Sequence, residues 1–417
     1  MQITVIFSAF FITIIAIMVL YPIALKLGLT DHPSHRKQHT AVTPLIGGLA
    51  CFLAIVITML INDGYFPNQQ AYILAGALLV FVGFVDDYKE LGIKIRLAAQ
   101  IGATLIMTEM AGLKIIDLGD LFLFGDIHLG VFSTLFTLFA VVGGVNAFNM
   151  IDGIDGLAGG LTFISVAVIA VIAELSQEII LLTFCCLFLA VIGGFLLFNA
   201  RIFGRLKAKI FLGDAGSTLF GFTVCWLAIS ISQGEHPLIS PSLVLWIITV
   251  PLLDSVCIML RRLTKGRSPF AADREHLHHI LSLAGFSVNK VLVILLGVSL
   301  ILSIIGGAIE YATDDSDAVL FVLFLMMFVG FYWCISHAWL LMKVIRYLRT
   351  LRDDDKKIGD RRKKDRRVHS DACVMVQRRD AMNRSEVTDR RHIPSQQQLN
   401  LISGNKNSIR KVLMGLK

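Results

Sequence analysis

The run ITVIFSAFFITIIAIMVLYPIAL, residues 3–25, contains no charged residue. An α-helix rises about 1.5 Å per residue and needs about 20 apolar residues to cross the roughly 30 Å hydrocarbon core of a membrane. The run therefore predicts a membrane-spanning helix. It has neither a basic leader nor a small-residue cleavage site, so we expect a retained span and not a signal peptide.

The composition of the whole chain agrees with this prediction. Of the 417 residues, 55% are hydrophobic and 17% are charged, and the mean hydropathy is +0.73. Soluble globular proteins contain about 45–50% apolar and about 25% charged residues, which excludes a soluble enzyme of ordinary composition. The seven cysteines show neither CxxC spacing nor a secreted disulfide framework. We predict an all-α polytopic integral membrane protein.

Apolar runs separated by polar breaks give eleven candidate spans. They cover residues 3–25, 43–61, 70–86, 96–112, 129–148, 158–173, 178–198, 212–232, 240–260, 290–310 and 318–343. The polar segments after the first, third, fifth, seventh and ninth runs hold 16 Lys and Arg, whereas those after the even-numbered runs hold one, Lys114. Because basic loops stay in the cytoplasm, the N-terminus is predicted outside and the C-terminus inside.

The basic character of the chain belongs to its C-terminal end. Residues 343–417 hold 21 Lys and Arg against 9 Asp and Glu, although the whole chain carries a net charge of only +7. We predict a transmembrane domain over residues 1–345 and a basic, disordered cytoplasmic tail over 346–417. Attraction of the tail to anionic lipid is the simplest interpretation. Docking of a partner or of nucleic acid is the less favoured alternative, and the overall prediction includes no nucleic-acid partner.

Acidic residues gather at the predicted cytoplasmic ends of three spans, in FVGFVDDYKE (81–90), NAFNMIDGIDGLAGG (146–160) and KIFLGDAGSTLFGF (209–222). Carboxylates that share one site repel each other unless a cation joins them. Mg²⁺ prefers oxygen ligands and one or two carboxylates together with substrate phosphate. A single Asp at a helix end is equally well explained as a cap, but the set favours a metal site. Its acids are Asp86, Asp87, Asp152, Asp155 and Asp214.

Spacing adds to this prediction. Asn146, Asn149, Asp152 and Asp155 recur every three residues, and the glycines between 153 and 160 make a regular helix unlikely there. Glycines let backbone approach a phosphate closely, although a flexible turn is the alternative. The segment GDAGS, residues 213–217, places an acid at a predicted helix N-terminus, whose free N–H groups suit a metal-bound phosphate.

Basic residues and histidines accompany the acids in the same predicted loops. The positive-inside pattern explains each basic residue singly. The HxHH spacing matches no common zinc site, so we favour phosphate contact for the histidines. Asp254 lies inside the ninth run, as a buried pairing residue or as a wall of the site. The candidate substrate-binding residues are Lys37, His39, Arg96, Asn146, Arg274, His276, His278 and His279.

An ion-coupled transporter is the remote alternative, because intramembrane acids also mark ion pathways. Transporter sites lie near the bilayer midplane on the broken helices of paired repeats. Here the acids lie at span ends on one side and the sequence shows no internal repeat, so an enzyme is favoured.

The motifs DDYKE, NAFNMIDGIDGLAGG, FLGDAGSTLFGF and SPFAADREHLHH, in this order, resemble the polyprenyl-phosphate N-acetylhexosamine-1-phosphate transferases. The resemblance covers about residues 1–350 and is strongest to the branch that uses UDP-GlcNAc. It implies transfer of GlcNAc-1-phosphate to undecaprenyl phosphate, with release of UMP, in the bacterial inner membrane. That reaction begins lipid-linked O-antigen or enterobacterial common antigen synthesis. Another UDP-N-acetylhexosamine is the alternative donor, and a homodimer is left open.

The resemblance also implies roles for the residues singled out above. Asp214 and Asn149 match metal positions for Mg²⁺, with Mn²⁺ as an alternative. Asp86, Asp87, Asp152 and Asp155 match catalytic acids. Arg96 matches a cation for the lipid phosphate, and the histidines match a loop that contacts pyrophosphate.

Overall fold

The computed structural model describes residues 2–31, 43–62, 66–201, 205, 207–269, 276–313, 316–337 and 342. Lys37, His39 and Arg274 lie outside the described residues, as does the predicted tail. The elements are α1 (Gln2–Leu27), β1 (Thr30–Asp31), β2 (Thr43–Pro44), α2 (Gly47–Ile61), α3 (Gln69–Lys89), α4 (Ile93–Met110), a 3₁₀ turn (Gly130–Phe132), α5 (Ser133–Met150), α6 (Leu157–Leu175), α7 (Ile179–Asn199), α8 (Gly213–Ser232), α9 (Pro241–Ile247), α10 (Thr249–Thr264), α11 (Leu277–Leu283), α12 (Val288–Ala312) and α13 (Ser316–Ser336).

Each of the eleven apolar runs contains helix, so the chain is an all-α polytopic membrane protein apart from the small antiparallel pair β1–β2. In the described part of the chain, eight helices are long and apolar enough to span a membrane. The count is nine if α9 and α10, which meet at 85°, form one broken span. Helix α2 is only 15 residues long, and α4 carries Lys94, Arg96 and Glu109. Helix α11 was not predicted from hydropathy because it is short and lies in a polar segment.

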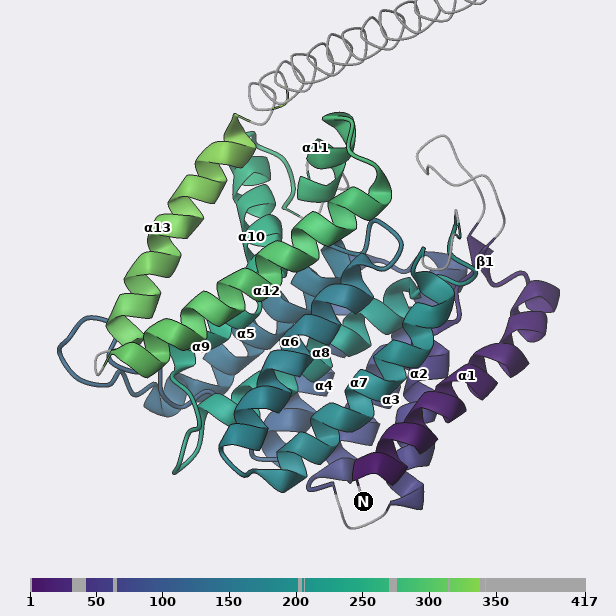
Figure 1. Ribbon diagram of the computed structural model, residues 1–417, viewed down its shortest axis with the longest axis horizontal. Helices are drawn as coiled ribbons and strands as arrows, with labels where there is room; N and C mark the ends of the chain where they lie inside the picture. Colours follow the sequence, from purple (N-terminus) through teal and green to yellow (C-terminus); the bar gives the residue numbers. More distant parts are fainter. Residues whose placement is uncertain are drawn as a thin grey trace, which may run out of the picture. The chain divides into compact units, whose positions relative to one another are not determined.

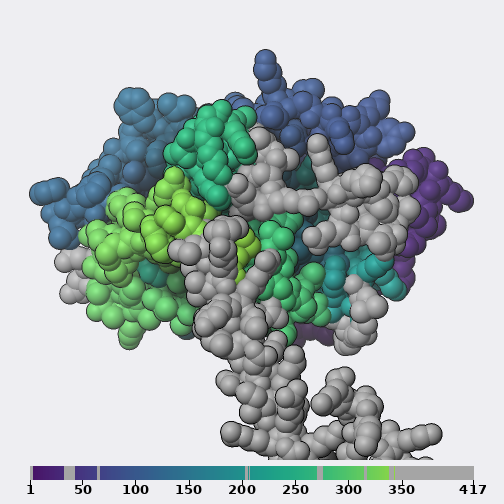
Figure 2. All heavy atoms as spheres, turned by 90° about the horizontal axis from the view of Figure 1, so that it is seen from above, coloured from purple at the N-terminus to yellow at the C-terminus, as the bar shows by residue number. Residues whose placement is uncertain are grey.

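Helix α8 lies in the middle of the bundle (Figure 1). Its apolar window is 94% buried, compared with 22% for α1, α12 and α13. Helices α2, α3, α5 and α6 pack around it, and a helix that is apolar on every side is suited to such a position. Helices α1 and α13 lie on opposite sides of the bundle (Figures 1 and 2). Their exposed large side chains, such as Phe7 and Met326, are those expected of helices that face lipid.

Small residues allow the backbones of α2 and α3 to touch the first turn of α8. A Cβ atom added to Gly48 would lie 2.2 Å from the backbone nitrogen of Gly216. A Cβ atom added to Gly83 would lie 2.4 Å from the Cα atom of Ala215. Close backbone approach of this kind is typical of small-residue contacts between membrane helices. It fixes the end of α3 against the start of α8, where the motif acids lie.

The variant Gly83→Ala should lower the stability of the folded protein by about 1–3 kcal/mol, because the new methyl group overlaps backbone atoms that cannot move independently. Thermal unfolding of the purified protein in detergent would measure this loss. Gly143→Ala in α5 is the matched control, since nothing lies within 4 Å of its added Cβ atom. It should be neutral or stabilising. Equal unfolding temperatures for the two variants would contradict the packing argument.

Candidate active site

Four elements bring polar side chains together at one end of the bundle: the C-terminal ends of α3 and α5 and the N-terminal ends of α4 and α8. The Nδ2 atom of Asn149 donates to Asp214 Oδ1 at 2.7 Å and to Ser217 Oγ at 2.8 Å. Arg96 lies 3.3 Å from Asp86 Oδ2 and 3.9 Å from Asp214 Oδ2. We call Asp86, Arg96, Asn149 and Asp214 the acid cluster. Its members were singled out from sequence, and the structure places them in direct contact.

Asp86 is held tightly within this cluster. Its residue is only 5% exposed, and its Oδ1 atom accepts a hydrogen bond from the backbone N–H of Leu91, just beyond the end of α3. Its Oδ2 atom faces Arg96. Because both oxygens are engaged, Asp86 is well placed to orient Arg96 and to add negative charge to the cluster.

Asp87 caps α8 instead of pointing into the acid cluster. Its carboxylate accepts hydrogen bonds from the backbone N–H groups of Asp214 at 2.9 Å and Ala215 at 3.4 Å. Gly213 permits this approach, because it has a φ of +74° and a Cβ atom there would lie 2.5 Å from Asp87 Oδ2. A carboxylate at a helix N-terminus satisfies unpaired N–H groups and the helix dipole. The start of α8, which we expected to offer these groups to a phosphate, is therefore occupied by Asp87.

Asp152 and Asp155 have different surroundings, although the sequence suggested similar roles. Asp155 is paired with Arg201 Nε at 2.7 Å and accepts a hydrogen bond from Ala208 N at 3.1 Å, so it anchors the segment that leads to α8. Among the described residues, the carboxylate of Asp152 has no hydrogen-bond partner. Asp152 is an exposed residue of the loop after α5, but the protein around its carboxyl group partly desolvates it. This desolvation, with the charges of Asp214 and Asp155, raises its pKa to about 7.

Asn146 lies beside the acid cluster and contacts a residue that the sequence analysis missed. Its Nδ2 atom donates to Gln100 Oε1 at 2.8 Å, and Gln100 is 5% exposed. Both side chains line a small cavity together with the acid cluster and the apolar residues Leu79 and Val82. The available sequence signal was an amide one turn after Arg96, inside the fourth apolar run.

The histidines reach the same region from α11. His278 is 1% exposed, and neither of its ring nitrogens has a hydrogen-bond partner among the described residues. A Cβ atom added to Gly153 would lie 2.1 Å from His278 Nε2, so the ring packs directly on the loop that carries Asp152. Burial, with the neighbouring His279 and His276, lowers the pKa of His278 to about 3. His278 is therefore neutral near pH 7 and supplies no positive charge to a phosphate.

The structure also settles the position of Asp254. This residue of α10 is fully buried, and its Oδ2 atom lies 2.8 Å from His276 Nδ1. The rings of His276 and His278 are stacked, with centroids 5.7 Å apart and 17° between their planes. Of the two alternatives left open by the sequence, Asp254 is a buried pairing residue.

Comparison with known proteins places the chain in a family. The model of glycosyl transferase family 4 matches residues 70–232. An undecaprenyl-phosphate alpha-N-acetylglucosaminyl 1-phosphate transferase of Salmonella typhimurium is 40% identical over 345 residues, which is 83% of this chain and 93% of the relative. The chain belongs to the polyprenyl-phosphate N-acetylhexosamine-1-phosphate transferase family.

Relatives of the same name extend this comparison and confirm the resemblance found from the motifs. The relative from Escherichia coli K12 is 39% identical over 83% of this chain and 93% of its own length. The relative from Pasteurella multocida is 35% identical over 82% of this chain and 94% of its own length. As a member of the transferase family, the chain is expected to use a divalent cation. The family match begins at α3 and ends with α8, so it contains the acid cluster and Asp152.

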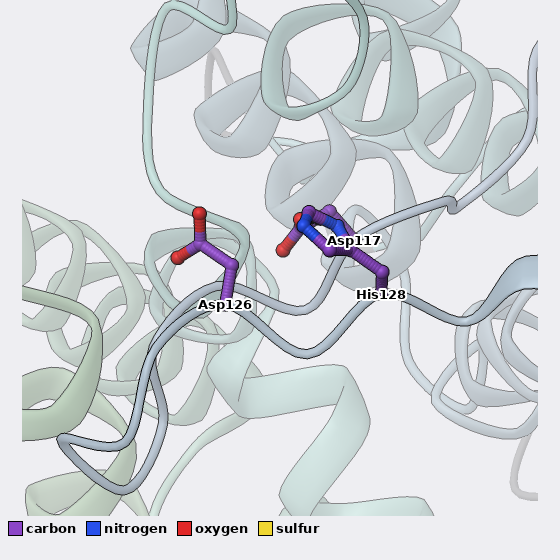
Figure 3. A group of neighbouring side chains, drawn as sticks. All are labelled: Asp117, Asp126 and His128. Carbon is purple, nitrogen blue, oxygen red and sulfur yellow. Dashed lines mark ion pairs between the residues drawn. The ribbon is translucent and has the colours of Figure 1, made fainter.

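The donor atoms of the acid cluster fit a hard divalent cation. Asp214 supplies carboxylate oxygens, and Asn149 donates through Nδ2, which leaves its Oδ1 atom for a metal. In the described part of the chain, three carboxylate or imidazole groups all lie within 4.8 Å of one another only at Asp117, Asp126 and His128. Figure 3 shows these in the connection between α4 and α5, at the other end of α4. The acid cluster offers too few protein ligands to surround an ion, so an ion bound there would keep water or phosphate as its other ligands.

The buried neutral His278 should make the protein less stable below pH 6.5. The unfolded chain binds a proton near pH 6.5, whereas the folded chain binds it only near pH 3, so stability falls as the pH drops through this window. Between pH 7.5 and 5.0, the wild type should lose about 2 kcal/mol more than His278→Gln, which does not titrate.

Thermal unfolding at the two pH values would measure this difference. His236→Gln is the control, because His236 is exposed in the connection between α8 and α9. It should follow the wild type. If His278→Gln loses as much stability on acidification as the wild type, His278 is not the group responsible.

Proposed function

We propose that this chain transfers N-acetylglucosamine 1-phosphate from UDP-GlcNAc to undecaprenyl phosphate, giving undecaprenyl-diphospho-GlcNAc and UMP. The observation that carries the proposal is the acid cluster, formed at one end of the bundle in a chain about 40% identical to transferases named for this reaction. Another UDP-N-acetylhexosamine is the alternative donor. The product would begin O-antigen or enterobacterial common antigen synthesis.

The proposed location is the bacterial inner membrane, with the acid cluster on the cytoplasmic side. Helix in all eleven apolar runs supports eleven crossings, although α2 has only 15 residues and α4 carries three charged residues. The 16 basic residues in the segments after the first, third, fifth, seventh and ninth runs support an outside N-terminus. This orientation places the ends of α3 and α5 and the start of α8 where a nucleotide sugar is available.

Charge neutralisation is the main demand of the reaction. A phosphate monoester has a second pKa near 6 and is mostly dianionic at pH 7, so the lipid phosphate needs little activation as a nucleophile. The donor diphosphate is also an anion, and the two groups must approach to bonding distance. A Mg²⁺ ion, or Mn²⁺, held by Asp214 and Asn149 would neutralise and orient the diphosphate, with Asp86 adding negative charge beside it.

Arg96 supplies the fixed positive charge on the protein side. It lies between two carboxylates and lines the cavity that also contains Gln100 and Asn146. Leu79 and Val82 form the apolar part of this cavity. We assign the lipid phosphate to Arg96, with the two amides as further hydrogen-bonding groups and the apolar wall beside the first units of the prenyl chain.

Direct in-line attack of the lipid phosphate on the β-phosphorus is the proposed chemical step. The P–O bond to UMP breaks, while the bond between the sugar and its phosphate is retained. The rival is a covalent phosphosugar on an aspartate, followed by a second displacement. Asp152 is the best candidate for that role, because its carboxylate is unpartnered among the described residues.

Incubation with labelled UDP-GlcNAc in the absence of lipid acceptor distinguishes the two routes. Direct attack predicts no labelled protein and no exchange of label between UMP and UDP-GlcNAc. Either signal in the wild type, together with its loss in Asp152→Asn, would favour the covalent route.

Asp214→Asn should lower the rate of UMP release by a factor on the order of 10²–10³, because it removes a charge from the proposed metal site without changing shape. UMP release from membranes, with and without undecaprenyl phosphate and Mg²⁺, would measure the effect across a panel of UDP-sugars. Asp126→Asn is the matched control, because Asp126 is exposed at the other end of α4. Full metal-dependent activity in Asp214→Asn would refute the metal assignment.

A further inference from the structure

The buried carboxylate of Asp254 lies outside the family match and binds two consecutive residues, His276 and Leu277. Both belong to residues 276–279, which we call the histidine segment. Asp254 is 0% exposed, and its two oxygens have different partners. Its Oδ2 atom accepts a hydrogen bond from His276 Nδ1, and its Oδ1 atom accepts one from the backbone N–H of Leu277, both at 2.8 Å. Burial of a carboxylate is costly unless it is paired and hydrogen-bonded. Within the described part of the chain, Asp254 meets this requirement through His276 and Leu277, at the start of α11.

The two hydrogen bonds constrain both the backbone and the ring. Leu277 is the first residue of α11, whose N–H has no partner within the helix, so Asp254 fixes where that helix begins. An ionised carboxylate can only accept hydrogen bonds, so the Nδ1 atom of His276 must carry a proton. Among the described residues, the Nε2 atom of His276 has no hydrogen-bond partner. A carboxylate that orients a histidine in this way determines which ring nitrogen remains available to a ligand.

This pair is connected to the proposed active site through packing. The ring of His276 stacks on that of His278, which lies against Gly153 beside Asp152. On the basis of the proposed function, we propose that Asp254 is a positioning residue. It holds His276 with Nδ1 protonated and Nε2 free for the phosphate groups of the nucleotide sugar. Asp254 itself touches no substrate and acts through His276.

The first test observes the proton directly and does not depend on catalysis. In Asp254→Asn, the side-chain amide can still accept from Leu277 but places an NH₂ group against His276. The proton of His276 should then move from Nδ1 to Nε2. Nitrogen NMR of ¹⁵N-histidine-labelled protein would show this change, with His276→Gln used to assign the signal. An unchanged protonation pattern at His276 in a folded Asp254→Asn protein would overturn the proposal.

A second variant covers the case in which Asp254→Asn does not fold. Asp254→Glu keeps a carboxylate and should retain the proton on Nδ1. Loss of that pattern in Asp254→Glu would also overturn the proposal. Asp317→Asn is the isosteric control, because Asp317 accepts a hydrogen bond from the backbone of Ser242 and is not part of the histidine segment. It should leave the His276 signals unchanged.

Kinetics provide the second test. In Asp254→Asn, kcat for UMP release should fall about 10- to 100-fold, while KM for undecaprenyl phosphate stays the same. The double variant Asp254→Asn, His276→Gln should be no slower than His276→Gln, because both changes remove the same function. Additive losses would overturn the positioning role. A wild-type protein that releases no UMP from any UDP-sugar would refute the proposed function. The NMR test would still show whether Asp254 determines which nitrogen of His276 carries the proton.

Discussion

The carboxylate of Asp87 accepts hydrogen bonds from the first backbone N–H groups of α8, and the arrangement of the site depends on this contact. Helix α8 is almost completely buried, and the N–H groups of its first turn need hydrogen-bond partners outside the helix. Gly213 leaves room for the carboxylate of Asp87. The close approach of Gly83 to Ala215 brings the end of α3 to the start of α8. Asp86 directly precedes Asp87 in the chain, and Asp214 is itself one of the two backbone donors, so the relative position of these two acids follows from the same interaction.

The remaining acids at this end of the bundle are separated by their partners. Asp155 is neutralised by Arg201 and Asp254 is hydrogen-bonded to His276, so both hold local structure in place. Asp152 has no such partner among the described residues, and its pKa is raised by desolvation first and then by the charges of Asp214 and Asp155. A group that is left unpaired in a crowded acidic site is available to a cation or a substrate, which distinguishes Asp152 from the other two.

The site is assembled from two parts of the chain. The family match covers residues 70–232, which include the acid cluster, whereas α10 and α11 lie beyond it. The contact between His278 and Gly153 joins the two parts. Because His278 is neutral, the histidine segment contributes hydrogen-bonding groups at that position, and Arg96 provides the positive charge at the acid cluster.

The sequence by itself determined the fold class, the helical runs and the list of polar segments that form the site. Hydropathy depends on composition over about 20 residues, and the motifs are local, so both can be read without knowledge of packing. The number of membrane crossings was less accessible, because α2 is short, α4 is charged and the ninth run is broken between α9 and α10. Short polar elements such as α11 give no hydropathy signal.

Only the tertiary structure decided which acids act together. Asp86 and Asp87 are adjacent in the sequence, yet one faces Arg96 and the other caps α8. Asp254, isolated in an apolar run, is paired with His276 across 22 residues. The physical reason is that a carboxylate's role depends on the donors and charges within a few ångströms of it, and those neighbours come from helices that are distant in the chain.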